Sequence, residues 1–219
     1  MSLERAGVAT LRINFRGEGD RLRTNIKSTL HSRVEDTENA YRFLTQKDGL
    51  ASGKIGVYGS SLGATTAIVP ASRHPDWFTT LAVWSSPSGD QGPGMMEGGL
   101  KNAAREAMAT GTGSFHFEGW KTVTFERDFF ESFEGVDLDA ALAKIPGAFL
   151  TVRGTEDFLP VRDREMVSLS GGNPRESVLI GGADHIFNIF DPEKDYHQRA
   201  VAATTGWFIR TLNAPSGPN

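Results

Sequence analysis

Short apolar runs alternate with longer amphipathic stretches along most of this chain. Runs typical of buried strands cover about residues 8–15, 54–58, 79–84, 145–153 and 177–181. Stretches with apolar residues at helical spacing cover about 31–46, 62–73, 160–169 and 195–212. Strands that alternate with helices in this way predict an α/β fold, in which a mostly parallel open sheet carries helices on both faces.

One long segment breaks the alternation and divides the chain. We expect residues 88–143 to form a cap, or lid, inserted between two parts of one α/β core, 1–87 and 144–213. Residues 214–219 contain two prolines and a glycine and are expected to be a flexible tail.

The cap segment is rich in glycine and in aromatic residues. Glycines cluster at 88–99 and 111–113, which predicts a backbone more mobile than the sheet, and a short helix is expected over 100–109. The aromatic residues either contact substrate or, as we favour for most of them, pack the cap on the core. They are Phe115, Phe117, Trp120, Phe125, Phe129, Phe130 and Phe133.

The most informative motif is Gly59-Ser60-Ser61-Leu62-Gly63, which matches G-x-S-x-G. It follows the strand expected at 54–58 and precedes the helix expected at 62–73, the context in which this motif presents a nucleophilic serine. The glycines lie two residues to either side of Ser61, so Ser61 and not Ser60 is the candidate nucleophile. They let strand and helix close on a strained turn, the nucleophile elbow. A glycine-rich turn without chemistry is the alternative interpretation.

A serine needs a base, and the base needs an acid that orients it. With this motif the expected order along the chain is serine, acid, histidine. The turn after the strand expected at 145–153 supplies Asp157 as the candidate acid, and Glu156 beside it is the competing one. Asp157 also suits a purely structural role as a turn residue or helix cap, because Asp favours both positions.

The candidate base is His185, in the loop after the strand expected at 177–181. Of the five histidines, it alone follows both Ser61 and Asp157 and comes just after a strand. The carboxyl ends of parallel strands form one edge of a sheet, so we expect these three residues to converge there as a catalytic triad. Asp184 is expected to cap or turn the loop, and an ordinary surface position is the alternative for the histidine.

The segments Gly59–Gly63, Gly154–Asp157 and Gly182–His185, in this order, resemble the α/β-hydrolase superfamily. Residues 3–20 are similar to a helix end, a strand and an RG-x-G turn of that superfamily. Within it, the chain most resembles the small serine carboxylesterases of the feruloyl and cinnamoyl esterase branch. The resemblance implies that the N–H of Leu62 is one donor to the oxyanion hole.

The resemblance also implies an unusual start. Family members normally carry additional strands before the segment that residues 3–7 resemble, and one of these strands separates the counterparts of 8–15 and 54–58. Either these two strands pair directly here, or a gap remains for another chain or upstream residues to fill. We therefore expect an oligomeric or marginally stable protein. We also expect low activity, because the absent segment normally supplies the second oxyanion donor.

Composition limits the remaining possibilities. The chain has 219 residues, of which 38% are hydrophobic and 23% charged, as in a single soluble domain. A net charge of −4 favours neither nucleic acid nor an anionic membrane as a partner. The absence of cysteine excludes disulfides and a cysteine nucleophile. Because no signal pattern or transmembrane-length apolar stretch is present, a cytoplasmic protein is expected.

Together these features predict a serine hydrolase that cleaves small carboxylic esters through an acyl-enzyme intermediate. Ser61 would attack the ester, His185 would accept the serine proton, and Asp157 would hold the imidazole. No cofactor or metal is expected. The expected partner is a small-molecule ester substrate, and the protein is expected to be either a homo-oligomer or marginally stable. The alternatives are a non-catalytic or activity-impaired relative, and a peptidase or thioesterase that uses the same three residues.

Overall fold

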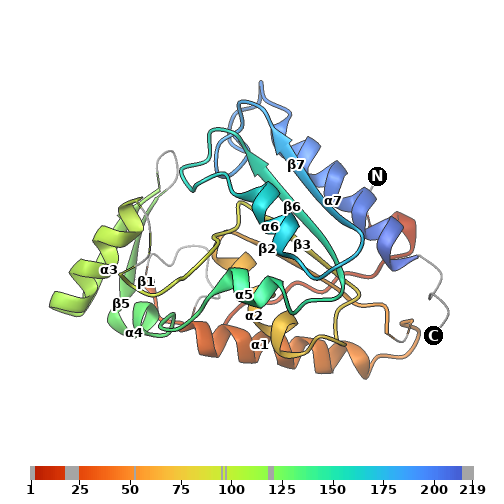
Figure 1. The fold of residues 1–219 in the computed structure, drawn as a ribbon, viewed down its shortest axis with the longest axis horizontal. Helices are drawn as coiled ribbons and strands as arrows, with labels where there is room; N and C mark the ends of the chain where they lie inside the picture. Colours follow the sequence, from red (N-terminus) through yellow and green to blue (C-terminus); the bar gives the residue numbers. More distant parts are fainter. Residues whose placement is uncertain are drawn as a thin grey trace.

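The centre of the molecule is a four-stranded parallel sheet with the strand order β2-β3-β6-β7 (Figure 1). These strands are Gly56–Ser60 (β2), Thr80–Trp84 (β3), Ala148–Gly154 (β6) and Arg175–Ile180 (β7). The computed structural model describes residues 3–17, 25–51, 53–94, 96, 98–117 and 121–213. The predicted α/β class with a mostly parallel open sheet is confirmed.

Helices cover both faces of this sheet (Figure 1). One face carries α2 and α6, with α1 and α5 packed beside them, and the other face carries α7. Their bounds are Leu30–Thr45 (α1), Leu62–Arg73 (α2), Leu138–Leu142 (α5), Asp163–Leu169 (α6) and Tyr196–Leu212 (α7). A single 3₁₀ turn, Glu4–Ala6, precedes them at the start of the chain. The bounds of α2 coincide with the helix predicted at 62–73.

Strand β6 contributes to a separate buried core on each face of the sheet. Side chains alternate across a strand, so neighbouring residues enter different cores. Phe149 belongs to the cluster that contains Ile68 and Met166, whereas Leu150 belongs to the cluster that contains Trp207 of α7. Every residue of β6 is buried. This double burial explains why its sequence is an almost continuous apolar run.

Two strands from the segment 88–143 and one strand from near the start of the chain form a second, smaller sheet, at the left of Figure 1. Strand β4, Thr112–His116, pairs antiparallel with β5, Thr122–Glu126, which pairs in parallel with β1, Asn25–Ile26. Helix α3, Gly98–Thr110, packs on β4, and α4, Arg127–Glu131, follows β5. The buried residues of this region belong to the same cluster as those of α1 and α2.

The sequence pattern indicates α3 but neither of the strands β4 and β5. Glycine is uncommon inside strands, and Gly113 is the second residue of β4. A Cβ atom at Gly113 would lie 1.8 Å from the carbonyl oxygen of Ala103. This glycine therefore serves a close approach between β4 and α3. The predicted mobility of the cap stays a prediction.

Most aromatic residues of the cap pack in the core, as the sequence analysis favours. Phe125, Phe129, Phe130 and Phe133 are at most 4% exposed. Phe115 and Phe117 are only partly buried and pack against the edge of the same core. Trp120 lies outside the described residues. The packing interpretation is confirmed for the first four, whereas Phe115 and Phe117 are packed only in part.

The strand expected at 8–15 is absent, and that prediction was wrong. These residues form no regular secondary structure, and within the described ranges β2 pairs only with β3. Direct pairing of 8–15 with the nucleophile strand, one of the two alternatives, is therefore wrong as well. An apolar pattern can indicate a strand, but a strand also needs a neighbour for its ladder of hydrogen bonds. Strand β2 is consequently an edge of the sheet.

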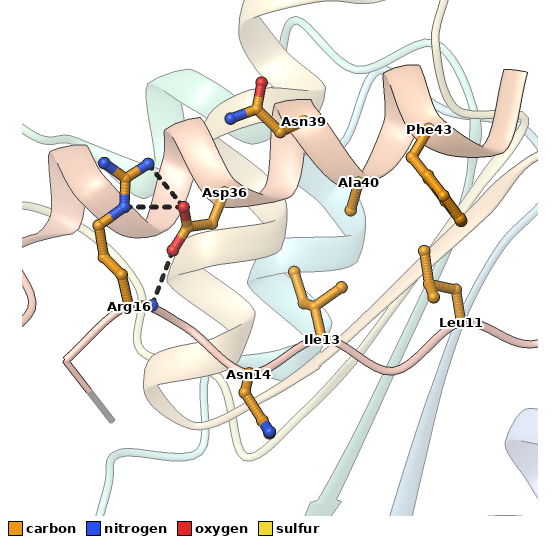
Figure 2. A pocket seen from close by; sticks show the side chains of 8 residues that line it. All are labelled: Leu11, Ile13, Asn14, Arg16, Asp36, Asn39, Ala40 and Phe43. Atoms are coloured by element: carbon orange, nitrogen blue, oxygen red, sulfur yellow. Dashed lines mark hydrogen bonds and ion pairs between the residues drawn. The ribbon is translucent and has the colours of Figure 1, made fainter. Parts of the chain in front are cut away.

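Side chains attach this N-terminal segment to α1 instead (Figure 2). The Arg16 guanidinium donates hydrogen bonds of 2.6 and 2.8 Å to one carboxylate oxygen of Asp36, and the Arg16 backbone N–H donates to the other at 2.9 Å. Leu11 and Phe43 point toward one another across a groove of about 440 Å³ between the segment and the helix. None of the candidate site residues lines this groove.

Candidate active site

Ser61 occupies a sharp turn between β2 and α2. Its backbone angles, φ 52° and ψ −121°, lie in a region that residues other than glycine rarely adopt. A Cβ atom at Gly59 would lie 2.0 Å from the Gly63 carbonyl oxygen, so glycine is required for this approach of strand and helix. The Ser61 N–H donates to the Trp84 carbonyl oxygen at 2.9 Å. The turn is thereby fixed to β3 at the carboxyl end of the sheet.

The structure brings together the three residues that the sequence singled out. His185 Nε2 lies 2.9 Å from Ser61 Oγ, and His185 Nδ1 lies 2.7 Å from Asp157 Oδ1. A carboxylate can only accept hydrogen bonds, so Nδ1–H donates to Asp157. The lone pair on Nε2 is then free to accept the Ser61 hydroxyl proton. The catalytic roles of the three residues remain predictions.

The two candidate acids of this turn, Glu156 and Asp157, lie in different surroundings. Glu156 is exposed, and its backbone N–H donates to the Ala183 carbonyl oxygen at 2.9 Å. That bond joins the acid turn to the histidine loop. Asp157 contacts the histidine and also accepts a 2.9 Å hydrogen bond from the Leu159 N–H. Asp157 is therefore both a turn residue and the partner of His185.

Asp184 shapes the loop that carries the histidine, as expected. Its Oδ1 accepts hydrogen bonds from the backbone N–H groups of Ile186 and Asn188 at 3.0 and 2.7 Å. From the opposite side, Ser85 Oγ donates to the His185 carbonyl oxygen at 2.8 Å. Ser85 has a φ of 45°, and no sequence signal indicates this residue. The loop is thus held from two directions.

A buried arginine lies behind the acid. The side chain of Arg153, near the end of β6, is fully buried, and its Nη1 donates to Asp157 Oδ2 at 2.9 Å. Its Nε donates to Asp163, and its Nη2 donates to the Ser86 carbonyl oxygen. Thr151 also donates to Asp163. The one signal for this cluster in the sequence is a lone arginine within an otherwise apolar strand.

The surroundings of Asp157 keep its carboxylate ionised. Burial opposes the charge, but the hydrogen bond and charge interaction with His185, the Leu159 N–H and the charge of Arg153 outweigh burial, so the pKa of Asp157 lies below its usual value. An ionised Asp157 stabilises a positive charge on the imidazole. The arrangement is therefore suited to a histidine that accepts a proton.

Phe158, the residue after the acid, covers the histidine. The centroids of the Phe158 and His185 rings lie 4.2 Å apart, and the phenyl ring is 48% exposed. Phe115 and Phe117 of the cap lie 5.8 and 6.4 Å from Phe158, centroid to centroid. No motif points to Phe158, because its ring contacts, to Phe115, Phe117 and His185, join segments that are distant in sequence.

Leu62 is the first residue of α2 and directly follows Ser61. The first N–H groups of a helix have no partner within the helix, and the helix dipole places positive charge there. The Leu62 N–H is therefore suited to bind an oxygen that becomes negative next to Ser61. This placement agrees with the oxyanion role that the resemblance implies for Leu62.

Two further features concern metals and membranes. Within the ranges that the structure describes, no three or more His, Asp or Glu side chains gather in a way that could hold a metal ion. In the same ranges, no helix combines the length and the apolar character needed to cross a bilayer.

No protein-family profile matches the sequence, and a search of curated proteins gave no match. Several solved structures are similar in fold. Est1E from Butyrivibrio proteoclasticus has a TM-score of 0.63 at 12% identity, over 85% of this chain and 72% of Est1E. The α/β hydrolase GrgF from Penicillium sp. sh18 has a TM-score of 0.65 at 11% identity, over 92% and 79% of the two chains.

A monoacylglycerol lipase from Paleococcus ferrophilus is also similar, with a TM-score of 0.59 at 17% identity, over 83% of this chain and 76% of the lipase. At such low identity these similarities concern the fold. The chain thus has an α/β-hydrolase fold, and structures with this fold include esterases and lipases. The resemblance inferred from the three sequence segments is confirmed at this level.

Proposed function

We propose that this protein is a serine hydrolase that cleaves carboxylic esters through an acyl-enzyme intermediate. One observation carries the proposal, namely the unbroken line of hydrogen bonds from Ser61 Oγ through His185 to Asp157. The strained turn that presents Ser61 at the start of a helix supports it, because this is where a nucleophile and an oxyanion donor are both needed. The similarity in fold to esterases and lipases agrees with it.

The first half of the reaction forms the acyl-enzyme. Ser61 Oγ attacks the ester carbonyl carbon while its proton moves to His185 Nε2. The carbonyl oxygen becomes negative and accepts a hydrogen bond from the Leu62 N–H. The imidazolium, stabilised by ionised Asp157, then donates its proton to the alcohol oxygen. The ester C–O bond breaks, the alcohol leaves, and the acyl group stays on Ser61.

The second half releases the acid. Water loses a proton to His185 Nε2 and attacks the acyl carbon, and the bond to Ser61 Oγ breaks as the proton returns to the serine. If Leu62 is the single donor to the oxyanion, turnover is lower by about 10²–10³ than with two donors.

Hydrolysis of p-nitrophenyl acetate tests the proposal. The wild-type protein should release nitrophenol, and Ser61→Ala should lower kcat by roughly 10⁴–10⁶. Ser60→Ala is the matched control and should keep wild-type turnover. No turnover by the wild type on any short-chain ester would favour the non-catalytic alternative. A Ser61→Ala variant that stays active would remove Ser61 from the mechanism.

The neighbouring acids provide a second test. Asp157→Asn should lower kcat by about 10⁴, because the histidine would lose both its orientation and the charge that stabilises the imidazolium. Glu156→Gln should have little effect, since Glu156 is exposed. The opposite pattern would transfer the acid role to Glu156. A series of ester, thioester and amide with the same acyl group would separate an esterase from a thioesterase or peptidase.

A further inference from the structure

Three aromatic rings from distant parts of the chain gather beside the candidate base. Phe158 lies against the His185 ring, and Phe115 and Phe117 approach it from the cap strand β4. Phe115 and Phe117 also meet each other edge to face, with centroids 4.6 Å apart. Single exposed apolar side chains are common and need no explanation. A cluster of this kind beside the candidate catalytic base is different, since clusters of aromatic residues bind apolar groups.

The cap holds its side of the cluster by close packing. A Cβ atom at Gly99, at the start of α3, would lie 2.1 Å from the Phe115 ring. At Gly113 a Cβ would collide with the backbone of α3 at Ala103. Glycine at these two positions brings β4 and its phenylalanines tightly onto the helix. The cap therefore fixes the positions of Phe115 and Phe117, whose rings lie beside that of the half-exposed Phe158.

The chemistry of the proposed reaction identifies which part of a substrate reaches this cluster. His185 must donate a proton to the leaving alcohol oxygen, so that oxygen comes within hydrogen-bond reach of Nε2. The carbon group attached to the oxygen then extends beside the imidazole. Phe158 covers the imidazole, and its exposed half is available for contact. The aromatic cluster thus borders the alcohol side of the ester.

We propose that Phe158, Phe115 and Phe117 form a binding site for the leaving group, and that the protein prefers esters of ring-bearing apolar alcohols over esters of small alcohols. This proposal rests on the proposed function. Stacked or edge-to-face contact with a phenyl ring adds to the burial of apolar area, and the two together are worth roughly tenfold in kcat/KM.

The test compares two pairs of esters. Benzyl acetate and methyl acetate share the acyl group, whereas methyl phenylacetate and methyl acetate share the alcohol. The wild type should prefer benzyl acetate over methyl acetate by roughly tenfold or more in kcat/KM. Phe158→Ala should lower that ratio by roughly tenfold and leave the ratio of methyl phenylacetate to methyl acetate unchanged. Phe158→Leu, which keeps most of the apolar surface, should restore part of the preference.

Phe43→Ala is the matched control, because Phe43 on α1 is also 48% exposed and lines the groove away from the candidate site residues. It should leave both ratios at their wild-type values. Equal losses for benzyl and methyl acetate in Phe158→Ala would overturn the proposal and make Phe158 a support for His185. A change confined to the acyl pair would also overturn it.

The failure of the proposed function gives a different result. A wild type without turnover of any of these esters would overturn both proposals. Turnover of methyl acetate without a preference for benzyl acetate would overturn the binding site alone.

Discussion

The two strands that lead to the candidate triad lie in very different surroundings. Strand β6, which leads to Asp157, has a neighbour on each side and is buried along its whole length. Strand β2, which leads to Ser61, has one neighbour within the described residues, and Tyr58 at its centre is 45% exposed. The acid thus follows a strand that is buried along its whole length, while the nucleophile follows the edge strand of the sheet.

This difference shows two ways to fix a reactive side chain. Asp157 is held by buried partners, above all Arg153, whose own partners are buried as well. Ser61 is held by local backbone geometry, in which Gly59 permits a turn that no larger residue allows. The acid is therefore held by side-chain partners, one of which, His185, lies 28 residues further along the chain. The serine is held mainly by its immediate neighbours in sequence.

The largest expected effect on stability comes from removing the buried Arg153, compared with a partly exposed arginine. Arg153→Met would leave two buried carboxylates without their cation and should lower the free energy of unfolding by about 3–5 kcal/mol. Arg162 makes ion pairs with Asp139 and Glu165, but its side chain is 32% exposed. Arg162→Met should therefore cost less than about 1 kcal/mol. Urea unfolding measures both, and equal losses would contradict the special position of Arg153.

A matched pair of valines tests the strands themselves. Val152 in β6 is fully buried, whereas Val57 in β2 is only partly buried. Val152→Ala should cost roughly 2 kcal/mol or more, because a cavity adds to the lost burial, and Val57→Ala should cost about 1 kcal/mol or less. Thermal and urea unfolding compare the variants. A larger loss for Val57→Ala would show that another chain or segment covers β2 in solution.

The smallest expected effect is a dependence of stability on pH. The pKa of Asp157 is lower in the folded protein than its usual value. Its ionised form therefore stabilises the fold above the unfolded pKa of about 3.9, and this contribution is lost as pH falls through the lowered folded pKa. The difference in stability between wild type and Asp157→Asn should shrink between about pH 5 and pH 2. A constant difference would mean that the charge of Asp157 contributes nothing.

The sequence was most informative where chemistry and local geometry coincide. The motif around Ser61 predicts both the candidate nucleophile and the strained turn that presents it. The order of residues along the chain was then enough to select Asp157 and His185. Phe158 could not be found in this way because its role depends on a contact across 43 residues of chain, to Phe115. Arg153 could not be found because the burial of its side chain with two carboxylates follows from the packing of the whole sheet. The prediction of a strand at 8–15 failed for a similar reason, because a strand also needs a neighbouring strand to pair with, and a local sequence pattern does not reveal that neighbour.

The central claim is that Ser61 is the reactive serine, and covalent labelling tests this claim most directly. The folded protein would be treated with a fluorophosphonate, and the modified residue located by mass spectrometry of the digested chain. We expect one added group on Ser61, no label in Ser61→Ala, and unchanged labelling in Ser60→Ala. Labelling that persists in Ser61→Ala, or that is found on Ser60 in the wild type, would contradict the account.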